Sequence, residues 1–134
     1  MASLTLVQPI LGPNDEDRVM QFRKLTDIER RIVDRLLAED FPGREAILKQ
    51  INQSVVKQLD EDGSLEFDVG MSPIAVSKFR IPVEGATEDV DGIPIHILLH
   101  VIDGRIKELE VYKEDSSAVI KMPDPEQLRL FRPQ

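Results

Sequence analysis

The sequence contains no cysteine and no tryptophan, and aromatic residues make up only 4% of its 134 positions. The absence of cysteine excludes disulfides, thiol catalysis and metal centres with cysteine ligands, and it leaves the redox compartment open. No apolar run approaches the ~20 residues of a membrane-spanning helix. Residues 1–12 also lack the basic start and long apolar stretch of a signal peptide. We therefore expect a cytoplasmic protein with an aliphatic core and no membrane partner.

Positive charge is scarce. The chain has 17 lysines and arginines against 25 aspartates and glutamates, so its net charge is -8 and its isoelectric point is about 4.8. Binding to nucleic acid depends on basic side chains that neutralise phosphates, so this partner is not expected either, and a neutral or basic protein partner suits the charge better. The hydrophobic share of 41% and the length fit a single globular domain over residues 1–134.

The short motifs of nucleophilic and nucleotide chemistry are also missing. No serine lies in a Gly-x-Ser-x-Gly elbow, and neither a glycine-rich phosphate loop nor a dinucleotide fingerprint occurs. The acidic stretch 84–91 lacks the regular ligand spacing of a calcium loop. We therefore expect no cofactor, and we favour a protein that is not an enzyme.

Residues 1–24 are expected to form an extended segment that covers part of the domain. The stretch is rich in aliphatic residues up to Leu11, which makes it too apolar for a free tail, but Pro9 and the Gly12-Pro13 pair interrupt it. The acidic run after Asn14 fits the start of a short helical turn.

Two helices are expected next. Thr26 and Glu29 fit a capping box, in which each side chain accepts a hydrogen bond from the other residue's backbone N–H. The apolar spacing after it predicts an amphipathic helix from Asp27 to near Asp40. Pro42 suits the first position of a second helix, whose buried residues would be Ala46, Ile47, Leu48 and Ile51.

The longest strand signal covers residues 93–113 and predicts a β-hairpin that turns at Asp103-Gly104. A two-residue loop would pair Ile97 with Glu110. A three-residue loop, closed by the glycine as a bulge, would pair Ile97 with Leu109 instead. Because a slip of one residue sends a strand's side chains to the opposite face, burial favours the bulged turn, which gathers the apolar pairs.

This register divides the hairpin into an aliphatic face, expected in the core, and a polar face. The aliphatic face carries Ile93, Ile95, Ile97, Leu99, Val101, Leu109 and Val111. The polar face carries Pro94, His96, Leu98, His100, Ile106, Glu108, Glu110 and Tyr112. Any function is expected on the polar face.

The same kind of bulged turn is predicted at Gly63, where it pairs Leu59 with Leu65 and Val55 with Val69. A third strand is expected at about residues 74–83, followed by a surface loop over residues 84–92.

The chain after the main hairpin is expected to turn once more and return. Ser116 occupies the turn position that glycine takes in the other two turns, which predicts a left-handed backbone conformation at some cost. Residues 118–121 are expected to form a short strand, and residues 128–131 form either a last short strand or an irregular tail. The expected divisions are a covering segment (1–24), helices (25–53), an antiparallel sheet (54–122) and a C-terminal tail (123–134).

The polar face of the main hairpin carries the residue types of a metal or acid–base site, namely His96, His100, Glu108 and Glu110. Residues four apart on a strand are about 13 Å apart, which is too far for both histidines to bind one ion at about 2 Å. His96 lies opposite Glu110 in the favoured register. We favour a cross-strand pair on a solvated face over acid–base or metal chemistry.

Four residues of the same face are apolar or amphipathic: Pro94, Leu98, Ile106 and Tyr112. Either the N-terminal segment or the C-terminal tail covers them, or they form a contact surface for a protein partner or a homodimer. We favour covering by the chain itself.

Several motifs together resemble a family of short uncharacterised bacterial proteins, a domain of unknown function. The resemblance covers about residues 24 to 123 and implies no activity, ligand or catalytic residue. Its motifs are Leu25-Thr26 with Glu29, Phe41-Pro42-Gly43, residues 60–66, Asp91-Gly92, Pro94, His96, residues 98–101, residues 103–105, residues 109–112 and Glu114-Asp115. Such sequences tend to have glycine where this chain has Ser116.

The expected fold is α+β, with two N-terminal helices packed on one face of a mostly antiparallel meander sheet of four to six strands. The expected function is that of a non-enzymatic protein-interaction or immunity-type binding module. The alternative is a small-ligand-binding or hydrolytic domain that uses His96 and Glu110, and it requires a pocket beside them.

Overall fold

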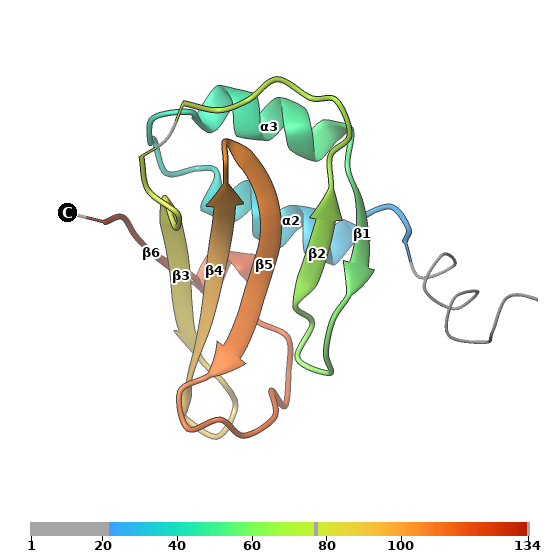
Figure 1. Cartoon of the computed structure of the whole chain (residues 1–134). Helices are drawn as coiled ribbons and strands as arrows, with labels where there is room; N and C mark the ends of the chain where they lie inside the picture. Colours follow the sequence, from blue (N-terminus) through green and yellow to red (C-terminus); the bar gives the residue numbers. More distant parts are fainter. Residues whose placement is uncertain (1–21, 77, 134) are drawn as a thin grey trace, which may run out of the picture.

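The computed structural model describes residues 22–76 and 78–133. Its elements are α2 (Asp27–Leu36), α3 (Arg44–Asn52), β1 (Val55–Gln58), β2 (Leu65–Asp68), β3 (Val83–Glu88), β4 (Pro94–Ile102), β5 (Arg105–Lys113), the 3-10 helix η2 (Pro125–Gln127) and β6 (Arg129–Phe131). All strand pairs are antiparallel, in the order β1-β2-β5-β4-β3-β6 (Figure 1). The predicted α+β class with a mostly antiparallel sheet is therefore confirmed.

The strand order departs from a meander at β2, which pairs with β5 instead of with β3. Most of the predicted covering segment, up to residue 21, lies outside the described residues. Neither described α-helix is long and apolar enough to cross a membrane.

The predicted capping box of α2 is confirmed. Glu29 N donates to Thr26 Oγ1 at 3.3 Å, and Thr26 N donates to Glu29 Oε1 at 2.9 Å. The helix ends at Leu36, before the predicted end near Asp40, because the chain closes into a tighter turn there and Ala38 N donates to the carbonyl of residue 35.

The second helix, α3, begins at Arg44. Gly43 takes the capping position with a left-handed φ of 89°. Pro42 therefore precedes the helix, and the prediction that placed it at the first helical position is wrong. Of the residues predicted to be buried, Ile47 and Ile51 are buried, whereas the other two, Ala46 and Leu48, are partly buried.

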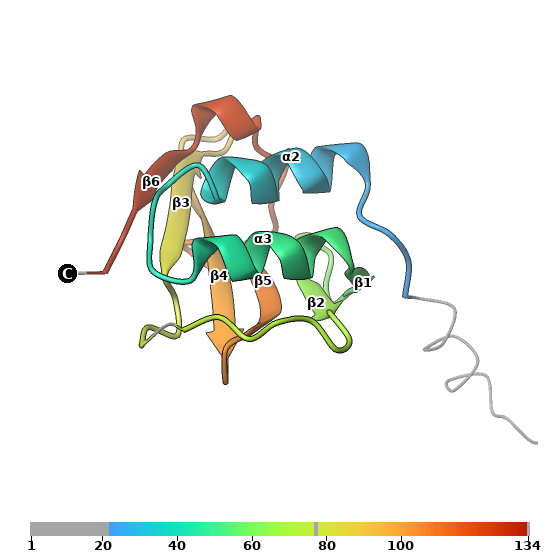
Figure 2. The same cartoon turned by 90° about the horizontal axis from the view of Figure 1, so that it is seen from above.

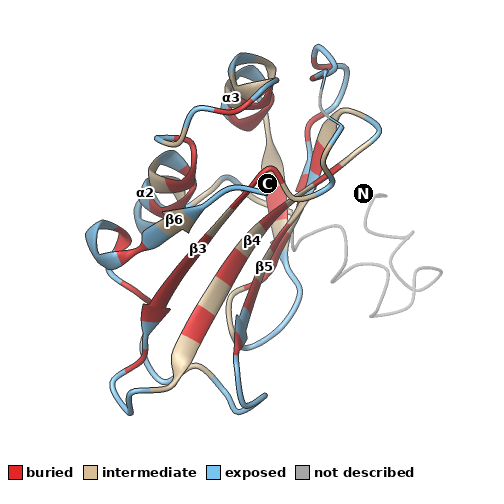
Figure 3. Ribbon diagram, turned by 90° about the vertical axis from the view of Figure 1, so that its left-hand side faces the viewer, coloured by how far each residue is buried: buried red, intermediate tan, exposed pale blue. Residues whose placement is uncertain are grey.

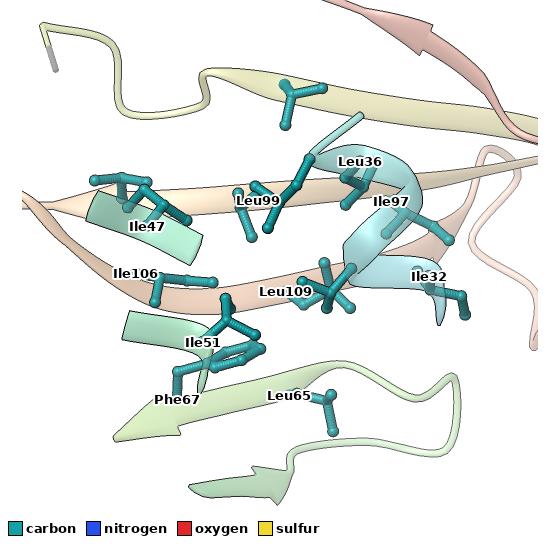
Figure 4. Close-up of a cluster of buried hydrophobic side chains, with 14 of the residues drawn as sticks. Ile32, Leu36, Ile47, Ile51, Leu65, Phe67, Ile97, Leu99, Ile106 and Leu109 are labelled. Atoms are coloured by element: carbon teal, nitrogen blue, oxygen red, sulfur yellow. The ribbon is translucent and has the colours of Figure 1, made fainter. Parts of the chain in front are cut away.

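The core lies between the helices and the sheet. Figures 2 and 3 show α2 and α3 on the same side of the sheet. Figure 4 shows the aliphatic side chains that meet there: Ile32 and Leu36 of α2, Ile47 and Ile51 of α3, and Leu65, Phe67, Ile97, Leu99, Ile106 and Leu109 of the sheet.

The main hairpin has a two-residue turn, so the predicted three-residue bulged turn is wrong. Asp103 and Gly104 both have positive φ values, 52° and 78°, as a type I′ turn requires, and Ile102 pairs with Arg105. Glycine is also required sterically, because a Cβ at Gly104 would lie 2.0 Å from Ile74 Cγ2.

The bulge that gathers the apolar pairs lies inside the ladder. Val101 pairs with Ile106 whereas His100 pairs with Glu108, so Lys107 is the extra residue on β5. Beyond this bulge, the register differs by two residues from the predicted one. A shift of two keeps side chains on their predicted face but gives them different partners.

The β1–β2 hairpin also differs from its prediction. Leu65 pairs with Gln58, so the predicted pairs of Leu59 with Leu65 and Val55 with Val69 are wrong. The register differs by one residue, and Leu59 is exposed.

An aspartate side chain supports this register. Asp60 Oδ1 accepts hydrogen bonds from the backbone N–H groups of Asp62 and Ser64, while Leu59 N donates to the carbonyl of Ser64 at 2.8 Å and Gly63 N donates to that of Asp60 at 3.4 Å, so the turn is tighter than the predicted one. Val56 then takes the buried position that the prediction gave to Val55.

The predicted strand over residues 74–83 is wrong, because β3 covers Val83–Glu88. Of the surface loop predicted over residues 84–92, only the turn over residues 89–92 is present. Pro82 has no N–H group to donate inside a ladder. Gly85 brings β3 close to a helix, because a Cβ at this position would lie 3.1 Å from a leucine methyl carbon of α2.

The predicted left-handed conformation of Ser116 is confirmed by its φ of 68°. The predicted strand over residues 118–121 is wrong, because its backbone N–H groups donate to the side chains of Asp62 and Asp89 and not to a strand. Of the two alternatives for residues 128–131, the structure shows the short strand, β6.

Candidate functional site

The face of the sheet that points away from the helices is called the outer face here. On β4 the residues at odd positions are buried, while those at even positions are half-buried, an alternation visible in Figure 3. The half-buried set includes His96, Leu98 and His100. The outer face therefore exposes both histidines of the chain.

His96 lies among carboxylates and one aromatic ring. Its Nε2 is 2.9 Å from Glu114 Oε1, and its Nδ1 is 3.4 Å from Glu84 Oε2. Its ring stacks on Tyr112, with centroids 5.1 Å apart. The predicted position opposite Glu110 is wrong, because the bulge in β5 places Tyr112 opposite His96.

His100, and not His96, contacts Glu110. His100 Nε2 is 2.8 Å from Glu110 Oε1, while Arg80 Nε donates to His100 Nδ1 at 3.3 Å. Because a guanidinium group only donates, Nδ1 accepts, and the imidazole proton lies on Nε2 and is donated to the carboxylate. The contacts at both ring nitrogens thus orient the His100 imidazole.

Tyr112 is surrounded by three carboxylates from different parts of the chain. Burial raises the pKa of the Tyr112 phenol, and the negative charges of Glu84, Glu110 and Glu114 raise it further. A negative field of this kind favours a cation at the outer face. We call Glu84, Glu110 and Glu114 the acidic centre.

The three members of the acidic centre have ion contacts of one kind. Among the described residues, the ion contacts of its three members are with histidines only. Several carboxylates elsewhere contact arginine or lysine, in the pairs Arg23–Glu29, Arg30–Asp34, Lys57–Glu66, Arg129–Glu88 and Lys113 with Asp89 and Asp91. The acidic centre therefore gathers three carboxylates of the outer face whose ion contacts in the described chain are with histidines and not with lysine or arginine.

The two histidines do not converge on one point. His96 contacts Glu84 and Glu114, whereas His100 contacts Glu110 and pairs across the ladder with Glu108. Within residues 22–76 and 78–133, no cluster of three histidine, aspartate or glutamate side chains is arranged to hold a metal ion.

The residues predicted as an interaction surface divide between the two faces. Pro94, Leu98 and Tyr112 lie on the outer face and are half-buried or exposed. Ile106 is buried in the core, which corrects its prediction. The bulge at Lys107 places Ile106 and Leu109 on the same side of β5.

A buried ion cluster at the far end of the hairpin was not predicted. Lys113 Nζ lies 3.1 Å from Asp89 Oδ2 and 2.6 Å from Asp91 Oδ2, and the lysine side chain is 1% exposed. The sequence of β5 indicates that this lysine is buried, because side chains alternate between the two faces of a strand and Lys113 lies on the same inward face as Leu109 and Val111. A lysine at such a position requires a buried counter-charge.

The electrostatics of this cluster favour its charged form. Burial alone would raise the pKa of Asp89, but hydrogen bonds from the backbone N–H groups of Ile120 and Val90, from Lys113 and from the N–H of Lys121 lower it to about 2. Burial alone would lower the pKa of Lys113, but the carboxylates of Asp91 and Asp89 raise it. The cluster thereby attaches residues 120–121 to the end of β5.

Grooves of about 270 to 370 Å³ occur elsewhere on the described surface. None of their lining residues is a histidine or a member of the acidic centre. These grooves therefore lie away from the acidic centre.

The fold and this face define a small α+β domain with an open, acidic sheet face. The family model described as "Domain of unknown function (DUF6984)" matches residues 22–123. The chain belongs to this family, which agrees with the resemblance noted in its motifs. Neither a curated protein nor a solved structure matched the chain.

Proposed function

We propose that this chain is a non-enzymatic protein-interaction module that binds a neutral or basic protein through the outer face of its sheet. The observation that supports this most is the acidic centre, in which three accessible carboxylates contact only histidines among the described residues. A lysine or arginine of a partner would supply the missing counter-charge and gain charge-assisted hydrogen bonds. The net charge of -8 would speed the approach of a basic partner.

The apolar part of the outer face suits the same role. Leu98 and Pro94 are half-buried, and Tyr112 is exposed beside the acidic centre. Tyrosine next to charged groups is typical of residues that dominate binding at protein interfaces. An immunity-type inhibitor of a basic protein, in a bacterial cytoplasm, is the specific form of this proposal.

A capture experiment with matched variants tests the proposal. The full chain is immobilised and exposed to host extract at about 0.15 M salt, beside two triple variants that each lose three negative charges. The first carries Glu84→Gln, Glu110→Gln and Glu114→Gln. The second carries Glu45→Gln, Glu61→Gln and Glu126→Gln, at exposed sites on α3, the β1–β2 loop and η2.

The proposal predicts one protein that the wild type and the second variant retain and that the first variant loses. Equal retention by both variants would contradict a role for the outer face. Capture of an enzyme substrate or a nucleic acid would contradict the proposal that the chain is a protein-interaction module.

The alternative, a small-ligand or hydrolytic role for His96 and Glu110, stays a prediction. Those two side chains have different partners, so a chemical role for either would use another pair, such as His100 with Glu110.

A further inference from the structure

The two histidines of β4 lie on the same face of the sheet, but their ring nitrogens have different partners. At His100 both nitrogens are engaged, because Nε2 lies 2.8 Å from Glu110 Oε1 and Nδ1 accepts a hydrogen bond from Arg80 Nε at 3.3 Å. At His96, Nε2 lies 2.9 Å from Glu114 Oε1. The other nitrogen of His96, Nδ1, is buried and has no hydrogen-bond partner.

A buried polar atom without a partner is uncommon in proteins and destabilises the fold. Within the part of the chain that the structure describes, the only other such side-chain atom is Arg35 Nε. His96 Nδ1 faces a carboxylate, because Glu84 Oε2 lies 3.4 Å away. A proton on Nδ1 would be directed at this carboxylate, so the surroundings of His96 fit an imidazolium that carries a proton on both nitrogens.

The imidazolium form would join two separate parts of the fold. It would donate from Nδ1 to Glu84 of β3 and from Nε2 to Glu114, which directly follows β5. Hydrogen bonds between two charged groups are shorter and stronger than those between neutral groups. Protonation of His96 would therefore hold both carboxylates against the ring.

The other groups around His96 do not replace it in this role. Tyr112 stacks on the His96 ring, and burial together with the nearby carboxylates raises the pKa of its phenol, so Tyr112 stays uncharged when histidine titrates. Arg129 of β6 lies in the same row of the sheet, beyond Ala86 of β3, but its guanidinium contacts Glu88 at 2.7 Å.

Protonation of His96 changes the charge that a partner meets. Glu84 and Glu114 together carry a charge of -2, and one imidazolium between them reduces the sum to -1. The side chains of Glu84 and Glu114 are 35% and 63% exposed, so a cation of a partner can reach both. The imidazolium would compete with this cation for the same oxygen atoms.

His100 is not suited to the same role. Its Nδ1 accepts the hydrogen bond from Arg80, so a proton on Nδ1 would break this bond and bring two positive charges together. His100 lies on the same strand and the same face as His96 and also contacts a carboxylate of the acidic centre. It is therefore a matched control for His96.

We propose that His96 is a proton switch of the acidic centre. While the ring is neutral, Glu84 and Glu114 are available to a basic side chain of a partner; when the ring is an imidazolium, it holds both carboxylates and the partner is released. The switch rests on the proposed function, because it controls the same surface. Release is expected as the pH falls through the range of about 8 to 5, in which histidine changes charge.

A short cationic peptide tests the switch without the natural partner. Binding of acetyl-Arg-Arg-Arg-amide to the full chain is measured at about pH 8 and about pH 5.5, from the NMR shifts of the backbone amides of Glu84 and Glu114. The affinity of the wild type should fall by about fivefold at the lower pH, the effect of one unit charge at about 4 Å in water. His96→Gln cannot gain a charge, so its affinity should fall by less than about twofold, whereas His100→Gln should show the same fall as the wild type.

A second measurement reports the protonation itself. The NMR resonances of the ring nitrogens of His96 should show a proton on both nitrogens at about pH 5.5. A ring with one proton at that pH would overturn the switch. Equal peptide affinity of the wild type at the two pH values, or the same fall in His96→Gln as in the wild type, would overturn it as well.

The capture experiment, repeated at both pH values, separates the switch from the proposed function. A protein that the wild type retains equally at both pH values, and that the triple variant of the acidic centre loses, would support the proposed function and overturn the switch. If no protein is captured, the proposed function is contradicted, and the peptide measurement decides on the switch by itself.

Discussion

The two faces of β4 differ although they alternate along one strand. Leu99 points into the core and is 0% exposed, whereas its neighbour Leu98 is half-buried on the outer face. The inner face contacts aliphatic side chains of both helices, and the outer face carries histidines among carboxylates. The inner face therefore stabilises the fold, and the outer face is where we propose that a partner binds.

The largest expected effect separates these two leucines. Leu99→Ala removes buried methyl groups and leaves a cavity, so the free energy of unfolding should fall by about 2 to 5 kcal/mol. Leu98→Ala should lower it by less than about 1 kcal/mol. Urea titration of both variants measures the difference. Equal losses of stability would show that the outer face is covered and would contradict the difference between the two faces.

The next effect concerns the side-chain amide of Gln50, which is buried on the inner side. Gln50→Leu leaves the buried Ile106 N–H without an acceptor, which should lower the free energy of unfolding by about 1 to 3 kcal/mol. The exposed amide of Gln58 donates to a loop carbonyl, and Gln58→Leu should change stability by less than about 0.5 kcal/mol. Urea titration again measures both. A Gln50→Leu variant as stable as the wild type would contradict the described hydrogen bonds.

An acid titration tests the buried ion cluster at the end of the hairpin. The pKa of Asp89 in the folded protein, about 2, lies below its ordinary value, so its contribution to stability is complete above about pH 4 and is lost as the pH falls toward 2. The melting temperature of the wild type should fall across this range. Asp89→Asn should melt lower at pH 7 and show a shallower fall with acid. An unchanged acid profile in the variant would exclude Asp89 as a cause.

The smallest effect lies outside both faces, in the turn after β5. Ser116 has a φ of 68°, which favours glycine, so Ser116→Gly should be neutral or raise the free energy of unfolding by up to about 1 kcal/mol. Gly104→Ala is the opposite case, because its Cβ would meet Ile74, and it should destabilise the protein. A clear fall in the melting temperature of Ser116→Gly would contradict the left-handed backbone conformation of Ser116 in this turn.

The helix cap and the two helices were predictable because their causes are local. Thr26 and Glu29 are three residues apart, and their capping box formed as expected. The turn at Asp103-Gly104 was located correctly, but the position of the bulge was not, because it depends on how Ile106 fits the core and donates to Gln50 of α3.

The polar contacts were harder to predict because they join distant parts of the chain. Asp89 accepts hydrogen bonds from Ile120 and Lys121, about thirty residues away, through a loop whose path no local pattern specifies. The partners of His96 changed with a shift of two residues in register. The burial of Lys113, in contrast, could be inferred from the sequence, because the residue lies at an inward position of an alternating strand.

The most direct test of the division between the faces combines stability and binding in one variant. The triple variant Glu84→Gln, Glu110→Gln and Glu114→Gln is unfolded in urea and, in parallel, used to capture the partner of the wild type. The account predicts that capture is lost while the free energy of unfolding changes by less than about 1 kcal/mol. Undiminished capture, or a loss of several kcal/mol in stability, would contradict it.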